Sequence, residues 1–216
     1  MKYNLAIFDL DGTILDTLDD LTNSVNHALR TAGYPTRIKG DIRSFLGHGA
    51  KYLIAGSLGD VADQETIDTV LGYFREHYDA HCTDSSVPYA GITGLFKSLR
   101  QHGYKIAVIS NKPDYAVHRL CQKHFTGMLD YIAGETKGVP KKPAPDAVNT
   151  ALATLNAEPF SSVYIGDSEV DIATAENAEI DGIIVDWGFR DHAMLVTAGA
   201  EIIVSSPEEL MNILLA

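Results

Sequence analysis

Two aspartates separated by one residue follow an apolar run near the N-terminus and carry the clearest chemical signal in the chain. They lie in the sequence Asp9-Leu10-Asp11-Gly12-Thr13. Two carboxylates on a loop that leaves a strand can share one site, and Gly12 would let the backbone approach a ligand closely. Such a string is expected by chance in roughly one chain in several hundred of this length. The alternative is an acidic surface turn, which the position at a strand end disfavours.

A second pair of aspartates lies far along the chain, in the sequence GDSEVD at residues 166–171. Asp167 and Asp171 are four residues apart, where a helix is expected to begin. Carboxylates clustered on loops suit a hard divalent cation, magnesium especially. Acidic residues also stabilise the N-terminus of a helix through its dipole, so a purely structural role is the alternative.

Groups that could hold a phosphate lie between these acidic segments. Ser110 and Asn111 offer a hydroxyl and an amide to a bound anion, although a polar turn would use the same residues. Lys141 and Lys142 precede a helix in the sequence KKPAP, and a lysine ammonium can neutralise phosphate charge. A rigid cationic loop is the alternative there. Lys112 is a further lysine near these positions, so the choice among the three stays open.

The elements that must position these residues are short strands. Apolar runs at 5–8, 105–109, 163–165, 182–185 and 202–204 alternate with helical patterns at 92–101, 116–123, 146–156 and 171–177. Runs that are apolar throughout suit parallel strands covered on both faces. The pattern predicts an α/β fold, a doubly wound, Rossmann-like parallel sheet. Ligands of such sheets bind beyond the carboxyl ends of the strands, where Asp9, Ser110 and Asp167 would converge.

Residues 16–82 have a different pattern. Helical spacing at 18–29, and further helices expected near 38–46, 50–58 and 64–80, contain no strand signal. Thr17 followed by Asp20 resembles a capping box at the first of these helices. We therefore expect a discontinuous core, residues 1–15 and 83–216, with a small helical cap domain, residues 16–82, inserted after the first strand.

Composition limits the function classes. The chain has 216 residues, of which 45% are hydrophobic and 21% charged, and a formal net charge of −12. That charge argues against nucleic-acid binding and against adhesion to an anionic membrane. No apolar stretch is long enough to span a bilayer and no signal peptide is recognisable. The two cysteines, Cys82 and Cys121, lack metal-site spacing, which favours a reducing, cytoplasmic location.

The four polar segments, in this order and strand context, resemble the motifs of the haloacid dehalogenase superfamily. The resemblance covers most of the chain: DxDGT at residues 9–13, a Ser or Thr that ends a strand, a Lys before Pro, and GDxxxD at residues 166–171. Within the superfamily, the sequences SNKP, KPAP and GDS look like the phosphoglycolate phosphatase branch. The stretch FLGHGA at residues 45–50 is similar to that branch's VGxG sequence.

The resemblance implies a role for each motif residue. Asp9 would be the nucleophile that forms an aspartyl-phosphate, and Asp11 the general acid and base. Mg²⁺ would be bound by Asp9, the backbone carbonyl of Asp11 and Asp167. Asp171 would support the metal through a water molecule or orient a lysine. The phosphate would be held by residues that follow the second and third motifs: Ser110, Asn111 and Lys142, the last being favoured over its neighbour by the Lys-Pro step.

Further expectations concern specificity and the competing functions. A small carboxylated substrate such as phosphoglycolate needs a cation from the cap, and Arg43, His48 and Lys51 are the candidates. The leading function is a magnesium-dependent phosphatase for a small phosphorylated metabolite, working as a monomer or homodimer. The alternatives are a phosphosugar mutase of the β-phosphoglucomutase type and a non-catalytic phospho-ligand module. A binding module would have no need of a general acid such as Asp11.

Overall fold

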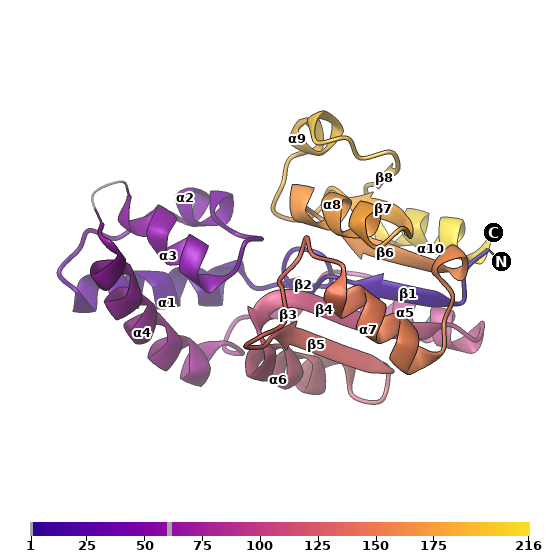
Figure 1. Cartoon of the computed structure of the whole chain (residues 1–216), viewed down its shortest axis with the longest axis horizontal. Coiled ribbons are helices and arrows are strands. Elements are labelled where there is room, and N and C mark those ends of the chain that lie inside the picture. The colour runs from indigo at the N-terminus through magenta and orange to yellow at the C-terminus, as the bar shows by residue number, and fades with distance from the viewer. Residues whose placement is uncertain (1, 60–61) are drawn as a thin grey trace.

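A six-stranded parallel sheet forms the centre of the larger part of the molecule (Figure 1). The computed structural model describes residues 2–59 and 62–216. The strand order is β5 (Tyr131–Glu135), β4 (Lys105–Pro113), β1 (Leu5–Phe8), β6 (Ser162–Gly166), β7 (Asp181–Val185) and β8 (Ile203–Val204). β1 pairs in parallel with both β4 and β6, so it lies at the centre of the sheet. This order confirms the predicted doubly wound fold.

Alternate residues of the central strands pack into two separate cores. Ala6 and Phe8 of β1 face one core, which is completed by α5 (Ile92–Gln101), α6 (Asp114–Phe125) and α10 (Pro207–Leu215). Leu5 and Ile7 face the other, which is completed by α7 (Asp146–Leu155) and α8 (Glu169–Asn177). All four side chains of β1 are fully buried. Burial on both faces explains why the strands have continuous apolar sequences rather than alternating ones.

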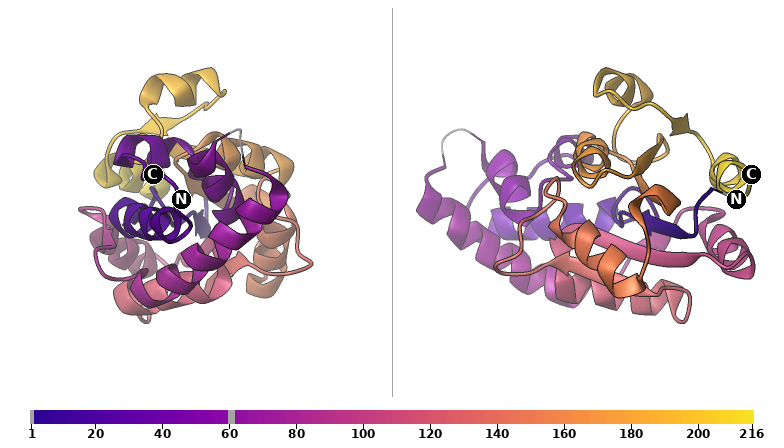
Figure 2. Two further views of the ribbon diagram at one scale, coloured as in Figure 1. Left: turned by 90° about the vertical axis from the view of Figure 1, so that its left-hand side faces the viewer. Right: turned by 45° about the vertical axis from the view of Figure 1, so that its right-hand side comes forward.

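Four helices lie beyond one end of the sheet, whereas both termini lie at the opposite end (Figures 1 and 2). They are α1 (Leu18–Thr31), α2 (Lys39–Ser44), α3 (Ala50–Leu58) and α4 (Gln64–His81), and we call them the helical segment. Their apolar faces form a core of their own, to which the larger part of the molecule adds Ala116 and Phe189. The helices lie within residues 16–82, and the division into two domains at those boundaries stays a prediction.

The two connections to the helical segment pair with each other. β2 (Leu15–Asp16) and β3 (Val87–Pro88) form a short antiparallel pair, so residue 16 belongs to a strand rather than to the helical segment. The predicted capping box at α1 is wrong. Thr17 makes no side-chain capping bond, and the Asp20 carboxylate instead accepts bonds from the amides of Ser85 and Ser86 and from the Ser86 hydroxyl.

Some elements carried no sequence signal. β5 and the short α9 (His192–Thr197) were not anticipated, because every residue of β5 is only half-buried and its pattern is weakly apolar. At the C-terminal helix, Ser206 accepts a capping bond from the Glu209 amide. Within the described part of the chain, no helix combines the length and apolar character needed to cross a membrane.

Candidate active site

Asp9 is placed by the central strand of the sheet. It follows β1 directly, and its amide donates to the Ile165 carbonyl of β6, which continues the sheet pairing past the end of the strand. The residue is only 7% exposed and lies at the edge of a pocket between the sheet and the helical segment. Burial raises the pKa of Asp9 to about 7; the Lys142 ammonium opposes this rise, whereas Asp171 and Asp11 add to it.

Lys142 joins the first and fourth motifs. Its Nζ lies 3.0 Å from Asp9 Oδ1 and 2.8 Å from Asp171 Oδ1, and it donates to the Tyr164 hydroxyl at 2.9 Å. Burial lowers the pKa of this buried lysine, but the attraction of Asp171 and Asp9 outweighs it, so the pKa lies well above its usual range. Lys142 therefore stays charged. Its neighbour Lys141 is half-exposed and pairs with Glu135 instead.

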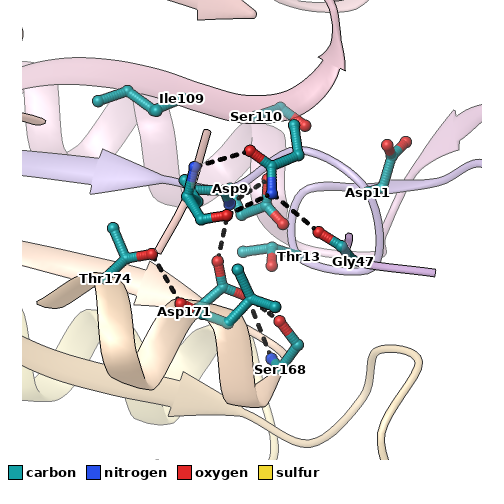
Figure 3. Close-up of polar contacts among 12 residues, drawn as sticks. Asp9, Asp11, Thr13, Gly47, Ile109, Ser110, Ser168, Asp171 and Thr174 are labelled. Carbon is teal, nitrogen blue, oxygen red and sulfur yellow. Dashed lines mark hydrogen bonds and ion pairs between the residues drawn. The ribbon is translucent and has the colours of Figure 1, made fainter. Parts of the chain in front are cut away.

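Asp171 holds the loop of the fourth motif in shape. Its Oδ2 accepts from the Ser168 hydroxyl at 2.6 Å and from the amides of Ser168 and Asp167, and Ser168 in turn caps α8 (Figure 3). With Oδ1 bonded to Lys142, both oxygens of Asp171 are committed to protein groups. Asp171 thus contacts Lys142 directly, and its role in orienting the lysine or supporting a metal stays a prediction.

Asp167 is held from the opposite side. Its Oδ2 accepts from the Phe189 amide at 2.6 Å, and its Oδ1 from the Thr13 hydroxyl at 3.2 Å. A Cβ atom on Gly12 or Gly188 would lie 2.3 or 2.4 Å from Asp167 Oδ2, so both positions need glycine for this carboxylate to fit. Burial raises the pKa of Asp167 well above its usual range, and the charges of Asp171 and Asp9 raise it further.

These residues fit a divalent cation. Asp9, Asp167 and Asp171 are the one group of potential ligands found among the described residues, with carboxylate oxygens within 4.8 Å of one another. Three buried carboxylates lie beside one ammonium, Lys142, and the raised pKa values of Asp9 and Asp167 reflect their burial next to other carboxylates. Asp9 Oδ1 is buried and lies 3.0 Å from Lys142 Nζ. Oxygen ligands of this kind are those that Mg²⁺ prefers.

Asp11 takes up a position apart from this cluster. Its carboxylate points away from the Asp9 group (Figure 3). Asp11 Oδ1 accepts a 2.6 Å hydrogen bond from the Thr17 hydroxyl and lies 2.8 Å from Lys112 Nζ. The predicted general acid is thus held at the junction between the sheet and the helical segment.

The second motif divides into two kinds of contact. Ser110 is buried and lines the pocket beside Asp9. The Asn111 amide donates to the carbonyls of Gly47 and Lys142 at 3.0 Å and accepts from the Lys142 amide at 2.9 Å. The Asn111 side chain therefore ties the Lys142 loop to the loop before α3, and its contact with phosphate stays a prediction.

The three candidates from the helical segment do not line the pocket. Arg43 pairs with Asp191 at 3.0 Å, His48 lies 3.3 Å from Glu169, and Lys51 pairs with Asp68 at 2.9 Å. The cations that do line it are Lys112 and Arg190. Their sequence signal was weak: Lys112 follows the second motif directly, and Arg190 ends the stretch after β7, where packing is the ordinary interpretation.

Comparison with known proteins places the whole chain in one group. The family model for haloacid dehalogenase-like hydrolases matches residues 6–185. A phosphoglycolate phosphatase of Agrobacterium fabrum is 34% identical over 197 residues, which cover 88% of this chain and 84% of that protein. A solved structure from Lactobacillus delbrueckii subsp. bulgaricus matches with a TM-score of 0.95 and 38% identity, and covers 99% of both chains. CbbY from Rhodobacter sphaeroides, solved with phosphate, matches at 0.80 with 26% identity over 96% of both chains.

Proposed function

The chain belongs to the haloacid dehalogenase-like hydrolases, and from this premise we propose that it is a phosphatase that hydrolyses a small phosphomonoester through an aspartyl-phosphate on Asp9. Phosphoglycolate is the first candidate substrate, because relatives named phosphoglycolate phosphatase align over most of the chain. The observation that carries the proposal is the state of Asp9. It follows the central strand, is buried at the pocket edge, and has its Oδ1 atom 3.0 Å from a charged lysine.

Asp9 would act as the nucleophile. One of its carboxylate oxygens attacks phosphorus, the bond from phosphorus to the ester oxygen breaks, and Asp11 gives a proton to the departing alcohol. Asp11 then accepts a proton from a water molecule, which attacks the aspartyl-phosphate, releases inorganic phosphate and restores Asp9. Because Asp11 is held by Thr17 and Lys112, this role requires its side chain to turn toward Asp9 within the pocket.

Other residues would hold the transferring group. Ser110 lines the pocket next to Asp9 and offers a hydroxyl to a phosphoryl oxygen. Lys142 already lies 3.0 Å from Asp9 and supplies the positive charge nearest to the reacting atoms. Asp171 would act through Lys142 by fixing its position. Groups of this kind that are fixed in advance lower the barrier to phosphoryl transfer by positioning and by charge.

Magnesium is the cofactor that the donor set fits. Asp9, Asp167 and the backbone carbonyl of Asp11 would hold the ion, with Asp171 close by. When bound, magnesium supplies positive charge that offsets the repulsion between a carboxylate and a phosphate dianion. The structural support for this assignment is the burial of three neighbouring aspartates whose carboxylate oxygens lie within 4.8 Å of one another.

The test is phosphate release from phosphoglycolate beside a panel of sugar and nucleotide monophosphates. Each substrate is run with magnesium, with a chelator, and with the Asp9→Asn variant. We expect release that needs magnesium and that falls by at least about 10³-fold in the variant. The ranking of the panel then identifies the substrate class.

Two results would overturn the proposal. Full activity of Asp9→Asn would remove the nucleophile assignment. Absence of release from every substrate would favour a mutase or a binding module, and incubation with a hexose 1-phosphate would separate them, because only a mutase yields the 6-phosphate.

A further inference from the structure

The pocket beside Asp9 continues past the reacting groups toward the helical segment. Apolar side chains from α1, α3 and α4 line its far side: Leu21, Leu53, Phe74 and the ring of Tyr78. A phosphomonoester with its phosphoryl group against Asp9 would extend its remaining atoms into this part. A substrate with a second negative charge therefore needs a cation there, because an unpaired charge is strongly disfavoured in a buried site.

Arg190 lines the pocket, and four of its five N–H groups already have protein partners. Its Nε and Nη2 bind both oxygens of Glu169 at 2.8 and 2.9 Å, and Nη2 also donates to the Leu46 carbonyl at 2.8 Å. Nη1 lies within hydrogen-bonding distance of the Arg43 carbonyl. Arg190 thus anchors the loop before α3 to the larger part of the molecule, and Glu169 neutralises its charge.

Lys112 is the remaining cation. It is 5% exposed, its Nζ lies 2.8 Å from Asp11 Oδ1, and it donates to the Tyr78 hydroxyl of α4. Among the described residues these are its polar side-chain contacts, so an ammonium with three hydrogens has one to spare. Lys112 is therefore a buried cation whose counterion is the predicted general acid.

We propose that Lys112, and not a residue of the helical segment, recognises a carboxylate on the substrate by exchanging it for Asp11. This inference rests on the proposed function and specifies its substrate class, a small phosphomonoester that carries a carboxylate. The incoming carboxylate takes the place of Asp11 as the ion-pair partner of Lys112. Asp11 is thereby released from one of its two side-chain partners, takes up a proton from water that its ion pair with Lys112 had disfavoured, and turns toward the leaving oxygen, to which it gives that proton.

The exchange links recognition to chemistry. A neutral substrate cannot replace Asp11, so the ion pair with Lys112 persists and the general acid stays turned away. A substrate carboxylate supplies the energy for that turn through a charge-assisted contact, which is typically worth about 1.5–3 kcal/mol, or roughly 10- to 100-fold in rate. The discrimination therefore falls in kcat as well as in KM, because the contact changes the state of a catalytic group.

The experiment compares phosphoglycolate with carbamoylmethyl phosphate, its near-isosteric neutral amide, as substrates of the full-length enzyme. For the unmodified protein we expect a kcat/KM at least about tenfold higher for the acid. In Lys112→Met the acid should lose most of its advantage, so that the ratio of the two kcat/KM values approaches one. Lys112→Arg keeps the charge and should keep a clear preference for the acid. Lys51→Met tests the competing cation of the helical segment in the same assay.

Each outcome decides the matter. A ratio near one in the unmodified protein overturns the inference without any variant, so a failure of Lys112→Met to fold does not protect it. An equal loss on both substrates in Lys112→Met would assign the lysine a merely structural role, and a lost preference in Lys51→Met alone would assign recognition to the helical segment. If no phosphomonoester is hydrolysed at all, the proposed function itself fails, which is a different result from hydrolysis without discrimination.

Discussion

The cluster at the ends of β1 and β6 and the surface of the helical segment hold polar residues in opposite ways. In the cluster, Asp9, Asp167, Asp171 and Lys142 are buried, and protein groups fix the orientation of the lysine and of the last two aspartates. On the helical segment, Lys51 and its partner Asp68 are each about half exposed and touch nothing in the pocket. This difference shows that a residue's type predicts its function only at positions where the backbone fixes the direction of the side chain.

The physical reason lies in solvation. A charge taken out of water must find partners with defined geometry, so a buried cluster has few possible arrangements. An exposed ion pair gains about 1 kcal/mol or less and can rearrange freely. Substitutions in the cluster should therefore change activity strongly, whereas those on exposed pairs should change little.

The largest expected effect separates two adjacent lysines. Lys142→Ala removes the ammonium from Asp9 and Asp171, and we expect phosphate release to fall by about 10²- to 10³-fold. Lys141→Ala removes a half-exposed pair with Glu135 and should stay within about threefold of the unmodified protein. Steady-state kinetics on both variants, after circular dichroism has verified folding, measures the difference. Equal and mild effects of the two substitutions would show that the buried cluster and the exposed surface do not differ in this respect.

The next effect depends on space around Asp167. In Gly188→Ala the new Cβ would lie 2.4 Å from both Asp167 Oδ2 and the Gly12 carbonyl, so the carboxylate must move. A misplacement of about 1 Å can cost about 10²-fold in rate, and we expect a loss of this order. The magnesium concentration for half-maximal activity should also rise. Gly94→Ala in α5, where nothing lies within 4 Å of the added atom, is the control. Unaltered magnesium dependence in Gly188→Ala would show that the cluster is more tolerant than its packing implies.

A smaller effect concerns the junction of the two regions. Asp20 is buried and joins α1 to the returning chain at Ser85 and Ser86, so Asp20→Ala should lower the free energy of unfolding by about 2–4 kcal/mol. Asp19→Ala removes an exposed pair with Lys39 and should cost under about 1 kcal/mol. Urea unfolding of both variants makes the comparison. Similar losses for the two neighbours would mean that the junction contributes nothing beyond the helix itself.

The smallest effect tests the tolerance of the helical segment. Gly72 lies within α4, is exposed and has nothing within 4 Å of a built Cβ. Gly72→Ala should therefore raise the free energy of unfolding by about 0.5–1 kcal/mol, because alanine restricts the unfolded chain and favours helix. The midpoint of urea unfolding gives the result, and activity serves as the internal control. A loss of stability would indicate that this face of α4 makes a contact and is not the freely exposed surface that the comparison assumes.

The errors of the sequence analysis share a cause. Thr17 and Asp20 have the spacing of a capping box, yet their side chains bind Asp11 and the Ser85–Ser86 backbone, which lie far along the chain or on another element. The side-chain amide of Asn111 likewise bonds to Gly47 and Lys142, and its predicted contact with phosphate stays a prediction. The spacing of residues in the sequence indicates only which hydrogen-bond partners are close along the chain. In the folded protein, the same polar groups bind partners that the tertiary structure brings to them.

The sequence by itself determined the sheet and the positions of its reactive ends. Short continuous apolar runs that alternate with helical patterns suit central parallel strands, and a residue that follows such a strand lies at the carboxyl edge of the sheet. That is why Asp9 and Asp167 could be placed together from their positions alone. Only the tertiary structure decided which cations face the pocket, because the direction of a long side chain depends on the partners that packing brings to it. Lys112 turns inward to Asp11 and Tyr78, whereas Lys51 turns outward to Asp68.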